Sequence, residues 1–159
     1  MKIPRKIIYR NKHISTILPS LLRKEAYCPY VRERIHTKDG DFFDVDWLQN
    51  SNESLVVLLH GLEGSSSQHY VRSQAELFSR KGFDIAAINF RSCSGEMNQT
   101  TRLYHSGETD DLDLLINTIR EKDTYKKIFL IGFSLGANVS LKYLGESSRT
   151  SVDGCVAFS

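Results

Sequence analysis

The chain has 159 residues and a mass of 18.1 kDa, a length that suits a single domain. Hydrophobic residues make up 40% and charged residues 25%, which is ordinary globular usage and argues against a disordered or fibrous chain. The formal net charge is only +2, whereas a nucleic-acid-binding domain usually carries a larger or more clustered basic excess. We therefore expect a globular domain that binds no nucleic acid.

The basic charge is concentrated near the N-terminus. Residues 1–36 contain nine Lys and Arg side chains and two Glu, and the remainder contains 12 basic and 17 acidic side chains. We interpret residues 1–30 as a basic arm that packs on a domain formed by residues 31–159. The alternative is peripheral contact of this arm with a membrane surface or an acidic partner.

Cysteine usage and the N-terminal sequence indicate the compartment. The three cysteines are odd in number and lack CxxC spacing, which argues against a disulfide framework or a zinc site. The apolar stretch 14–22 is interrupted by Ser, Thr and Pro, so it predicts neither a signal peptide nor a stable membrane anchor. We expect a cytoplasmic location.

The first predicted element is a β-hairpin, because the β-prone runs 31–37 and 42–48 flank a turn that carries Asp39-Gly40. Strands and helices then alternate. Continuous apolar runs predict buried strands over 55–59, 83–90, 128–131 and 155–158. Helical spacing predicts helices over 68–80 and 108–122, and a third helix after residue 134 with Ala137, Leu141 and Leu144 on one side. This alternation predicts an α/β fold with a mostly parallel sheet.

Ligands of such sheets bind beyond the carboxyl ends of the strands, so the residues that follow each strand are the candidates for chemistry. The sequence Gly132-Phe133-Ser134-Leu135-Gly136 lies between a predicted strand and a predicted helix, as a G-x-S-x-G nucleophile turn requires. A serine there has a strained backbone, and the helix directs its amides toward developing negative charge. We interpret Ser134 as the nucleophile; the alternative is a simple Gly/Ser turn.

The loop that begins with His60-Gly61-Leu62 follows the strand over 55–59. Serine hydrolases place an oxyanion-hole amide at this position, and we assign it to the N–H of Leu62, with a second from Leu135. The loop contains neither a phosphate-binding G-x-x-x-x-G-K-[ST] nor a dinucleotide-binding G-x-G-x-x-G pattern. His60 is a candidate base, and the alternative is a turn histidine bonded to local backbone.

A second histidine precedes the helix over 108–122. His105 is followed by Ser106 and Thr109, either of which could cap that helix, and by acids that favour its dipole. His105 could alternatively be a base, but it precedes Ser134, whereas hydrolases with a G-x-S-x-G turn have the chain order Ser, acid, His.

Four ordered motifs, HGLEGSSSQHYVRS, INFRSCSGEMN, YHSGETDDL and IGFSLGANVSLKYLGE, resemble the YheT-like α/β-hydrolases. The resemblance covers nearly the whole chain, from about Asn11 onward. The chain departs from the family pattern at Lys12 and Ser15, where Pro and Gln are usual, and at Ser92, where Gly is common. The family implies the α/β-hydrolase fold and activity on carboxylic esters with medium-chain or lipid-like acyl groups, with no metal or cofactor.

In this family, further strands bring a catalytic aspartate and then a histidine after the nucleophile. The chain has 25 residues after Ser134, among which are Glu146 and Asp153 but no histidine. Asp153 precedes a predicted strand, which is the wrong end of the sheet for catalysis. We therefore expect the N-terminal portion of the fold, with its C-terminal strands and helices absent, the acid and base beyond residue 159, and an exposed apolar edge at the last strand.

Three functions remain open at this stage. The first is a serine esterase that forms an acyl-enzyme on Ser134. The second is an alcohol O-acyltransferase, which uses the same acyl-enzyme but a different acceptor. The third is a non-catalytic hydrolase remnant, since a serine without a base is a weak nucleophile.

Overall fold

A computed structural model describes residues 27–146 and 152–159, so most of the expected basic arm lies outside the described residues. The strands are β1 (Val31–His36), β2 (Phe42–Leu48), β3 (Ser54–Leu59), β4 (Asp84–Asn89), β5 (Lys127–Phe133) and β6 (Gly154–Phe158). The helices in this part of the chain are α3 (His69–Ser79), α4 (Asp110–Glu121) and α5 (Leu135–Gly145). The order along the chain is the predicted one.

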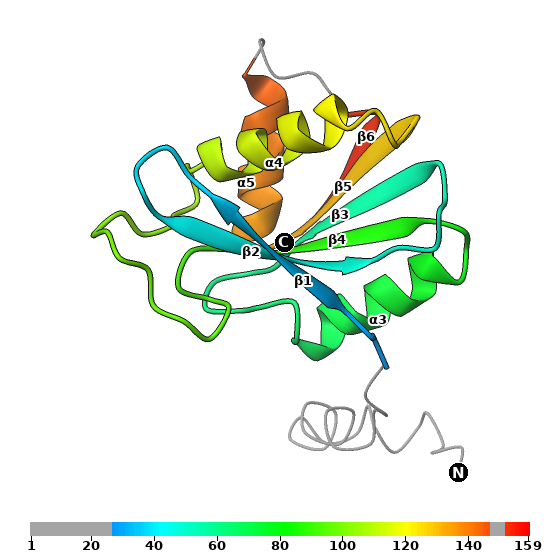
Figure 1. The fold of residues 1–159 in the computed structure, drawn as a ribbon, viewed down its shortest axis with the longest axis horizontal. Coiled ribbons are helices and arrows are strands. Elements are labelled where there is room, and N and C mark those ends of the chain that lie inside the picture. The colour runs from blue at the N-terminus through cyan, green and yellow to red at the C-terminus, as the bar shows by residue number, and fades with distance from the viewer. Residues whose placement is uncertain (1–26, 147–151) are drawn as a thin grey trace, which may run out of the picture.

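The strands form one mixed sheet in the order β1-β2-β4-β3-β5-β6. Strands β3, β4, β5 and β6 are parallel, β2 is antiparallel to β4, and β1 pairs with β2 as the predicted antiparallel hairpin. Helix α3 covers one face of the sheet, and α4 and α5 lie on the other (Figure 1). This three-layer arrangement confirms the predicted α/β fold.

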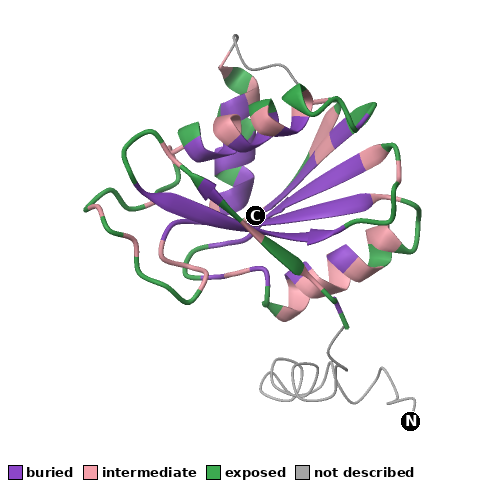
Figure 2. Ribbon diagram, in the orientation of Figure 1, coloured by how far each residue is buried: buried purple, intermediate pink, exposed green. Residues whose placement is uncertain are grey.

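The central strands are buried on both faces, which explains their continuous apolar sequences (Figure 2). In β3, Leu55, Val57 and Leu59 belong to the core that includes α4 and α5. Val56 and Leu58 alternate with them and pack in the second core, beneath α3. Because successive side chains of a strand point to opposite faces of the sheet, β3 contributes to both cores.

Helix α4 confirms the predicted spacing, because its apolar stripe is buried at Leu112, Leu115, Ile116 and Ile119. The helix begins two residues later than predicted. Thr109 occupies the N-cap position, but its hydroxyl donates to Glu146 Oε2 (2.7 Å) and makes no capping hydrogen bond. The capping prediction for Thr109 was therefore wrong, because a tertiary partner takes the hydroxyl.

The predicted inner side of α5 was wrong in part. Leu141 is 56% exposed, and the buried residues are Gly136, Ala137, Val139, Ser140 and Tyr143. Gly136 and Ala137 are small and buried because the start of this helix touches the backbone of the sheet, whereas Tyr143 is buried farther along it. The Ser140 hydroxyl donates to the carbonyl of Gly136 (2.8 Å), which satisfies its buried oxygen within the helix.

Strand β6 lies at the edge of the sheet next to β5. Val156 and Phe158 are 49% and 50% exposed, although the Phe158 ring stacks on Phe133 with 5.2 Å between ring centroids. The predicted apolar edge is therefore confirmed. Within residues 27–146 and 152–159, none of the helices combines the length and the hydropathy that a membrane span requires.

Candidate active site

Ser134 lies at the sharp junction between β5 and α5. Its backbone has φ 51° and ψ −112°, a combination that L-residues rarely adopt. The Ser134 N–H donates to the carbonyl oxygen of Phe158 (2.7 Å), so the edge strand holds the turn. The residue is exposed, and none of the described side chains hydrogen-bonds to its hydroxyl.

Two glycines allow this junction to form. A Cβ on Gly132 would lie 2.4 Å from the carbonyl oxygen of Gly136, and a Cβ on Gly136 would lie 2.5 Å from that of Leu59. Any side chain here would therefore collide with backbone. Because neither glycine has a side chain, the first turn of α5 can lie against the end of β3. Leu135 is the first residue of that helix. N–H groups in the first turn of a helix lack intrahelical partners and favour negative charge.

The loop over residues 60–64 lies beside the nucleophile, since a Cβ on Gly61 would be 3.4 Å from Cβ of Ser134. Three of its N–H groups are engaged. That of Gly61 donates to the Tyr70 hydroxyl (3.0 Å), that of Glu63 donates to the Tyr104 hydroxyl (2.7 Å), and that of Gly64 donates to the Gly61 carbonyl (3.1 Å). The Leu62 N–H makes no hydrogen bond with any residue that the structure describes.

His60 faces backbone with both ring nitrogens. Its Nδ1 donates to the Gly61 carbonyl (2.6 Å), and its Nε2 accepts from the N–H of Phe90 (3.2 Å). These partners assign the proton to Nδ1 of a neutral ring. The side chain is fully buried, and burial lowers its pKa. This geometry favours the alternative of a turn histidine bonded to local backbone.

His105 lies in an exposed turn before α4. Its Nδ1 accepts from the N–H of Gly107 (3.1 Å), so the ring closes a local turn. The Asn138 side chain donates to the carbonyl of Ser106 (2.8 Å), which places this turn next to the first turn of α5. His105 is therefore close to the nucleophile-bearing helix, but its ring is engaged locally and not with Ser134.

A buried polar cluster that the sequence analysis missed holds the other end of the loop after β3. The Ser66 N–H donates to Asn89 Oδ1 (2.9 Å), its hydroxyl donates to Asp46, and Asn89 Nδ2 donates to the same carboxylate (3.0 Å). Burial raises the pKa of Asp46, but hydrogen bonds from Arg32, Ser66 and Asn89 outweigh it and lower the pKa. The cluster joins three segments that are distant in sequence, so no local sequence pattern could have predicted it.

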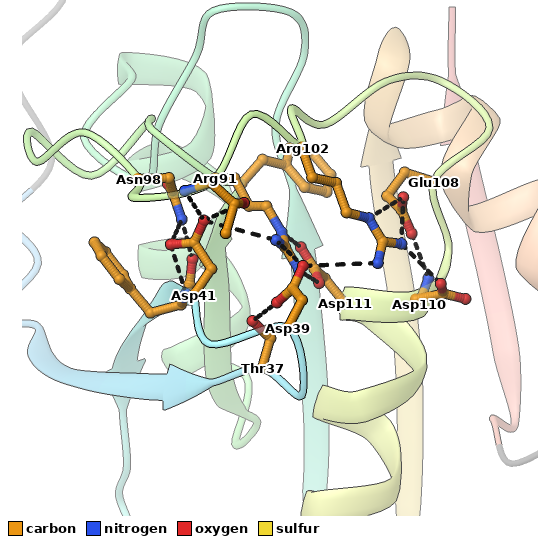
Figure 3. Close-up of polar contacts among 12 residues, drawn as sticks. Thr37, Asp39, Asp41, Arg91, Asn98, Arg102, Glu108, Asp110 and Asp111 are labelled. Carbon is orange, nitrogen blue, oxygen red and sulfur yellow. Dashed lines mark hydrogen bonds and ion pairs between the residues drawn. The ribbon is translucent and has the colours of Figure 1, made fainter.

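A second polar network holds the segment between β4 and α4, which carries Tyr104 (Figure 3). Arg91, only 1% exposed, makes two hydrogen bonds of 2.8 Å to Asp111 and a third to Asp39 (2.7 Å). Asn98 donates to Asp41 (2.5 Å) farther along the segment. The hairpin turn and α4 thus fix this segment from both sides.

A cavity of about 490 Å³ lies beside Leu62, between this segment and the loop after β3. Its other lining residues include Glu63, Ser65, Cys93 and Tyr104. Burial raises the pKa of the Cys93 thiol, so that group is less readily ionised than an ordinary cysteine. Within the described ranges, no group of three or more His, Cys, Asp or Glu side chains is placed to hold a metal ion.

A mostly parallel sheet with an exposed serine on a strained strand-to-helix turn defines the class of α/β proteins that includes the serine hydrolases. Residues 54–159 match the family described as "alpha/beta hydrolase fold". The chain belongs to this family, which confirms the resemblance inferred from its motifs.

Similar proteins agree with this assignment. The chain is 34% identical over 157 residues to "Putative esterase YheT" of Escherichia coli, covering 95% of the chain but 46% of that protein. It is 34% identical over 114 residues to "Monoacylglycerol lipase" of Saccharomyces cerevisiae, covering 69% and 25%. A structure of the Pyrococcus furiosus esterase Pf2001 superposes with a TM-score of 0.71 at 26% identity, covering 85% and 53%. The chain spans about half the length of these relatives, or less.

Proposed function

We propose that this protein is a carboxylic-ester hydrolase that forms an acyl-enzyme on Ser134. The observation that carries the proposal is an exposed serine on a strained turn, next to a loop whose Leu62 N–H has no hydrogen-bond partner in the described part of the chain. The names of the relatives, an esterase and a lipase, support an ester as the substrate.

The geometry supports the following steps. The Ser134 oxygen attacks the acyl carbon as its proton passes to a base, and the carbonyl oxygen becomes an oxyanion. The N–H groups of Leu62 and Leu135 donate to that oxyanion, a form of stabilisation worth about 3 kcal/mol for one donor. The leaving alcohol takes the proton, and water then attacks the acyl-enzyme to release the acid and regenerate the serine. We place the base, a histidine paired with an aspartate, in the part of the relatives' length that this chain does not span.

We further propose medium-chain or lipid-like acyl groups. Support comes from the yeast monoacylglycerol lipase and from "Medium-chain fatty acid ethyl ester synthase/esterase 2" of Saccharomyces cerevisiae, which is 32% identical over 109 residues. The cavity beside Leu62 adjoins the proposed oxyanion site and offers space for one arm of such an ester.

A fluorophosphonate probe tests the nucleophile in the complete gene product that contains this sequence. We expect labelling of the wild type, loss of labelling in Ser134→Ala, and retained labelling in Ser67→Ala. Ser67 is a suitable control because it is another exposed serine near the same end of the sheet. No labelling of a folded wild-type protein would contradict the proposal and leave the non-catalytic remnant as the better interpretation.

The name of the yeast synthase/esterase favours acyl transfer to an alcohol as a second candidate function. The acyl-enzyme is the same, but an alcohol in place of water attacks it and forms a new ester. Product analysis with ethanol and a medium-chain acyl-CoA separates the two activities. Ethyl ester formation would support the transferase, whereas free acid alone would exclude it under those conditions.

A further inference from the structure

We propose that Tyr70 and Tyr104 are positioning residues that aim the Leu62 N–H at the oxyanion; this inference rests on the proposed function. The proposed mechanism assigns no role to either tyrosine. Neither hydroxyl is proposed to touch the substrate. Each instead accepts a hydrogen bond from a backbone N–H on one side of Leu62.

The direction of the Leu62 N–H is set by the peptide that joins it to Gly61. This peptide is trans, so its N–H points away from its carbonyl. The Gly61 carbonyl accepts from His60 Nδ1 (2.6 Å) and from the N–H of Gly64 (3.1 Å), which anchors one side of the peptide plane. The Leu62 N–H on the opposite side therefore has a fixed direction, and none of the residues that the structure describes accepts a hydrogen bond from it.

The two tyrosines fix the peptides before and after this one. The Tyr70 hydroxyl holds the N–H of Gly61 at 3.0 Å, and the Tyr104 hydroxyl holds that of Glu63 at 2.7 Å. Glu63 has a φ of 54°, a strained value that requires support from its surroundings. With both neighbouring peptides held, rotation of the middle peptide would break at least one of these bonds.

The tyrosine rings are themselves held rigidly. Tyr70 is the second residue of α3, and its ring packs edge-on against Phe133, the residue before the nucleophile, with 4.8 Å between ring centroids. Tyr104 stacks on Phe90 at 5.3 Å and 5°. The arginine network of Figure 3 holds the segment that carries Tyr104. We call Tyr70 and Tyr104 together the tyrosine clamp. This clamp joins the loop after β3 to the nucleophile turn through Tyr70 and to the segment after β4 through Tyr104.

The test compares Tyr70→Phe, Tyr104→Phe and a control, Tyr125→Phe, in the complete gene product with p-nitrophenyl hexanoate as substrate. Each change removes one hydroxyl and keeps the ring. The Tyr125 hydroxyl donates to Asp84 (3.0 Å) at the start of β4, the opposite end of the sheet, so its loss affects stability alone. We expect kcat to fall about 10-fold to 100-fold in each clamp variant, with KM little changed, and to stay at the wild-type level in the control.

Amide hydrogen exchange supplies a readout that does not depend on activity. We expect the Glu63 amide to be protected in the wild type and to exchange at least about tenfold faster in Tyr104→Phe, with the same effect at Gly61 in Tyr70→Phe. The Leu62 amide should exchange rapidly in every variant. Unprotected Gly61 and Glu63 amides in the wild type would overturn the clamp whatever the activity.

The outcomes separate the two proposals. Wild-type turnover with unchanged kcat in both clamp variants would overturn the positioning role and leave the esterase proposal intact. A fall in kcat in Tyr125→Phe equal to that in the clamp variants would also overturn it, because a general loss of structure would then explain all three. Absence of both wild-type turnover and Ser134 labelling would remove the proposed function and the positioning role together.

Discussion

The turn after β5 is held by contacts between backbone atoms, whereas the loop after β3 is held by side chains from distant segments. At the first, Gly132 and Gly136 let α5 approach the sheet so closely that no Cβ fits. At the second, hydroxyls from α3 and from the segment after β4 hold the loop amides on either side of Leu62. Both meet at Ser134, yet they place their groups by different physical means.

The difference separates what folding requires from what catalysis requires. Backbone contact leaves no room for adjustment, so a change at the nucleophile turn should disturb the packing of α5 on the sheet. Loss of a tyrosine hydroxyl that holds the loop after β3 leaves the packing intact but frees a peptide of that loop to rotate. Mutations in the first turn should therefore lower stability, and mutations in the second should lower kcat before they lower stability.

The largest effect should follow Gly136→Ala. Its Cβ would lie 2.5 Å from the Leu59 carbonyl oxygen and 2.6 Å from that of His60, so α5 would have to move away from β3. We expect the free energy of unfolding to fall by about 3 kcal/mol, the upper end of the usual cost of overpacking, and Ser134 labelling to be lost. Urea unfolding monitored by circular dichroism measures the first effect.

Gly145→Ala is the matched control, because it makes the same change in the same helix. A Cβ at Gly145 would meet no atom of residues 27–146 or 152–159 within 4 Å. We expect its stability to be unchanged or to increase by up to about 1 kcal/mol, since alanine favours a helix more than glycine does. Similar losses in the two variants would show that helix propensity, and not close contact with β3, determines the cost.

A smaller effect should follow Asp111→Asn, which weakens the anchor of the segment that carries Tyr104. Asp111 accepts two hydrogen bonds from the buried Arg91 guanidinium, which would keep Asp39 as a charged partner. We expect a loss of about 2 kcal/mol in unfolding free energy, because hydrogen bonds to a charged group are lost or weakened in a buried site. Urea unfolding measures the loss of stability. Faster hydrogen exchange of the Glu63 amide would show that loosening the segment after β4 also loosens the loop after β3.

The control for this change is Glu53→Gln, which removes a carboxylate from an exposed pair with Lys126. Exposed ion pairs contribute at most about 1 kcal/mol, so we expect little change. If Asp111→Asn cost no more than this control, the buried network would not be what holds the segment after β4.

The same contrast explains which features could be predicted from the sequence. The turn at Ser134 could be, because Gly132 and Gly136 lie within two residues of the serine and the contact depends on local geometry. The tyrosine clamp could not, because Tyr104 is 41 residues from its partner Glu63 and only the sheet brings them together. The inner side of α5 was mispredicted for a related reason. Hydrophobicity favoured Leu141, but the close approach at Gly136 directs the side of α5 that carries Gly136, Ser140 and Tyr143 toward the sheet.

The smallest expected effect is a pH dependence of stability that arises in the loop after β3. His60 belongs to the loop after β3, and burial lowers its pKa below the ordinary value of about 6.5. The folded state therefore binds fewer protons than the unfolded state between that value and the lower folded pKa. By linkage, stability should be constant above about pH 7 and should fall as the pH drops through this window, with a slope of up to about 1.4 kcal/mol per pH unit.

Urea unfolding midpoints between pH 7.5 and 5 measure this slope in a range where most carboxylates stay ionised. A protonated His60 would carry a hydrogen on Nε2 facing the N–H of Phe90, so the histidine and the backbone would present two donors to each other. His60→Gln should be less stable at pH 7.5 but should have a flatter profile over the window. Stability that rises toward pH 5 in the wild type would mean that the charged ring is favoured, and that His60 faces an acid in place of the backbone.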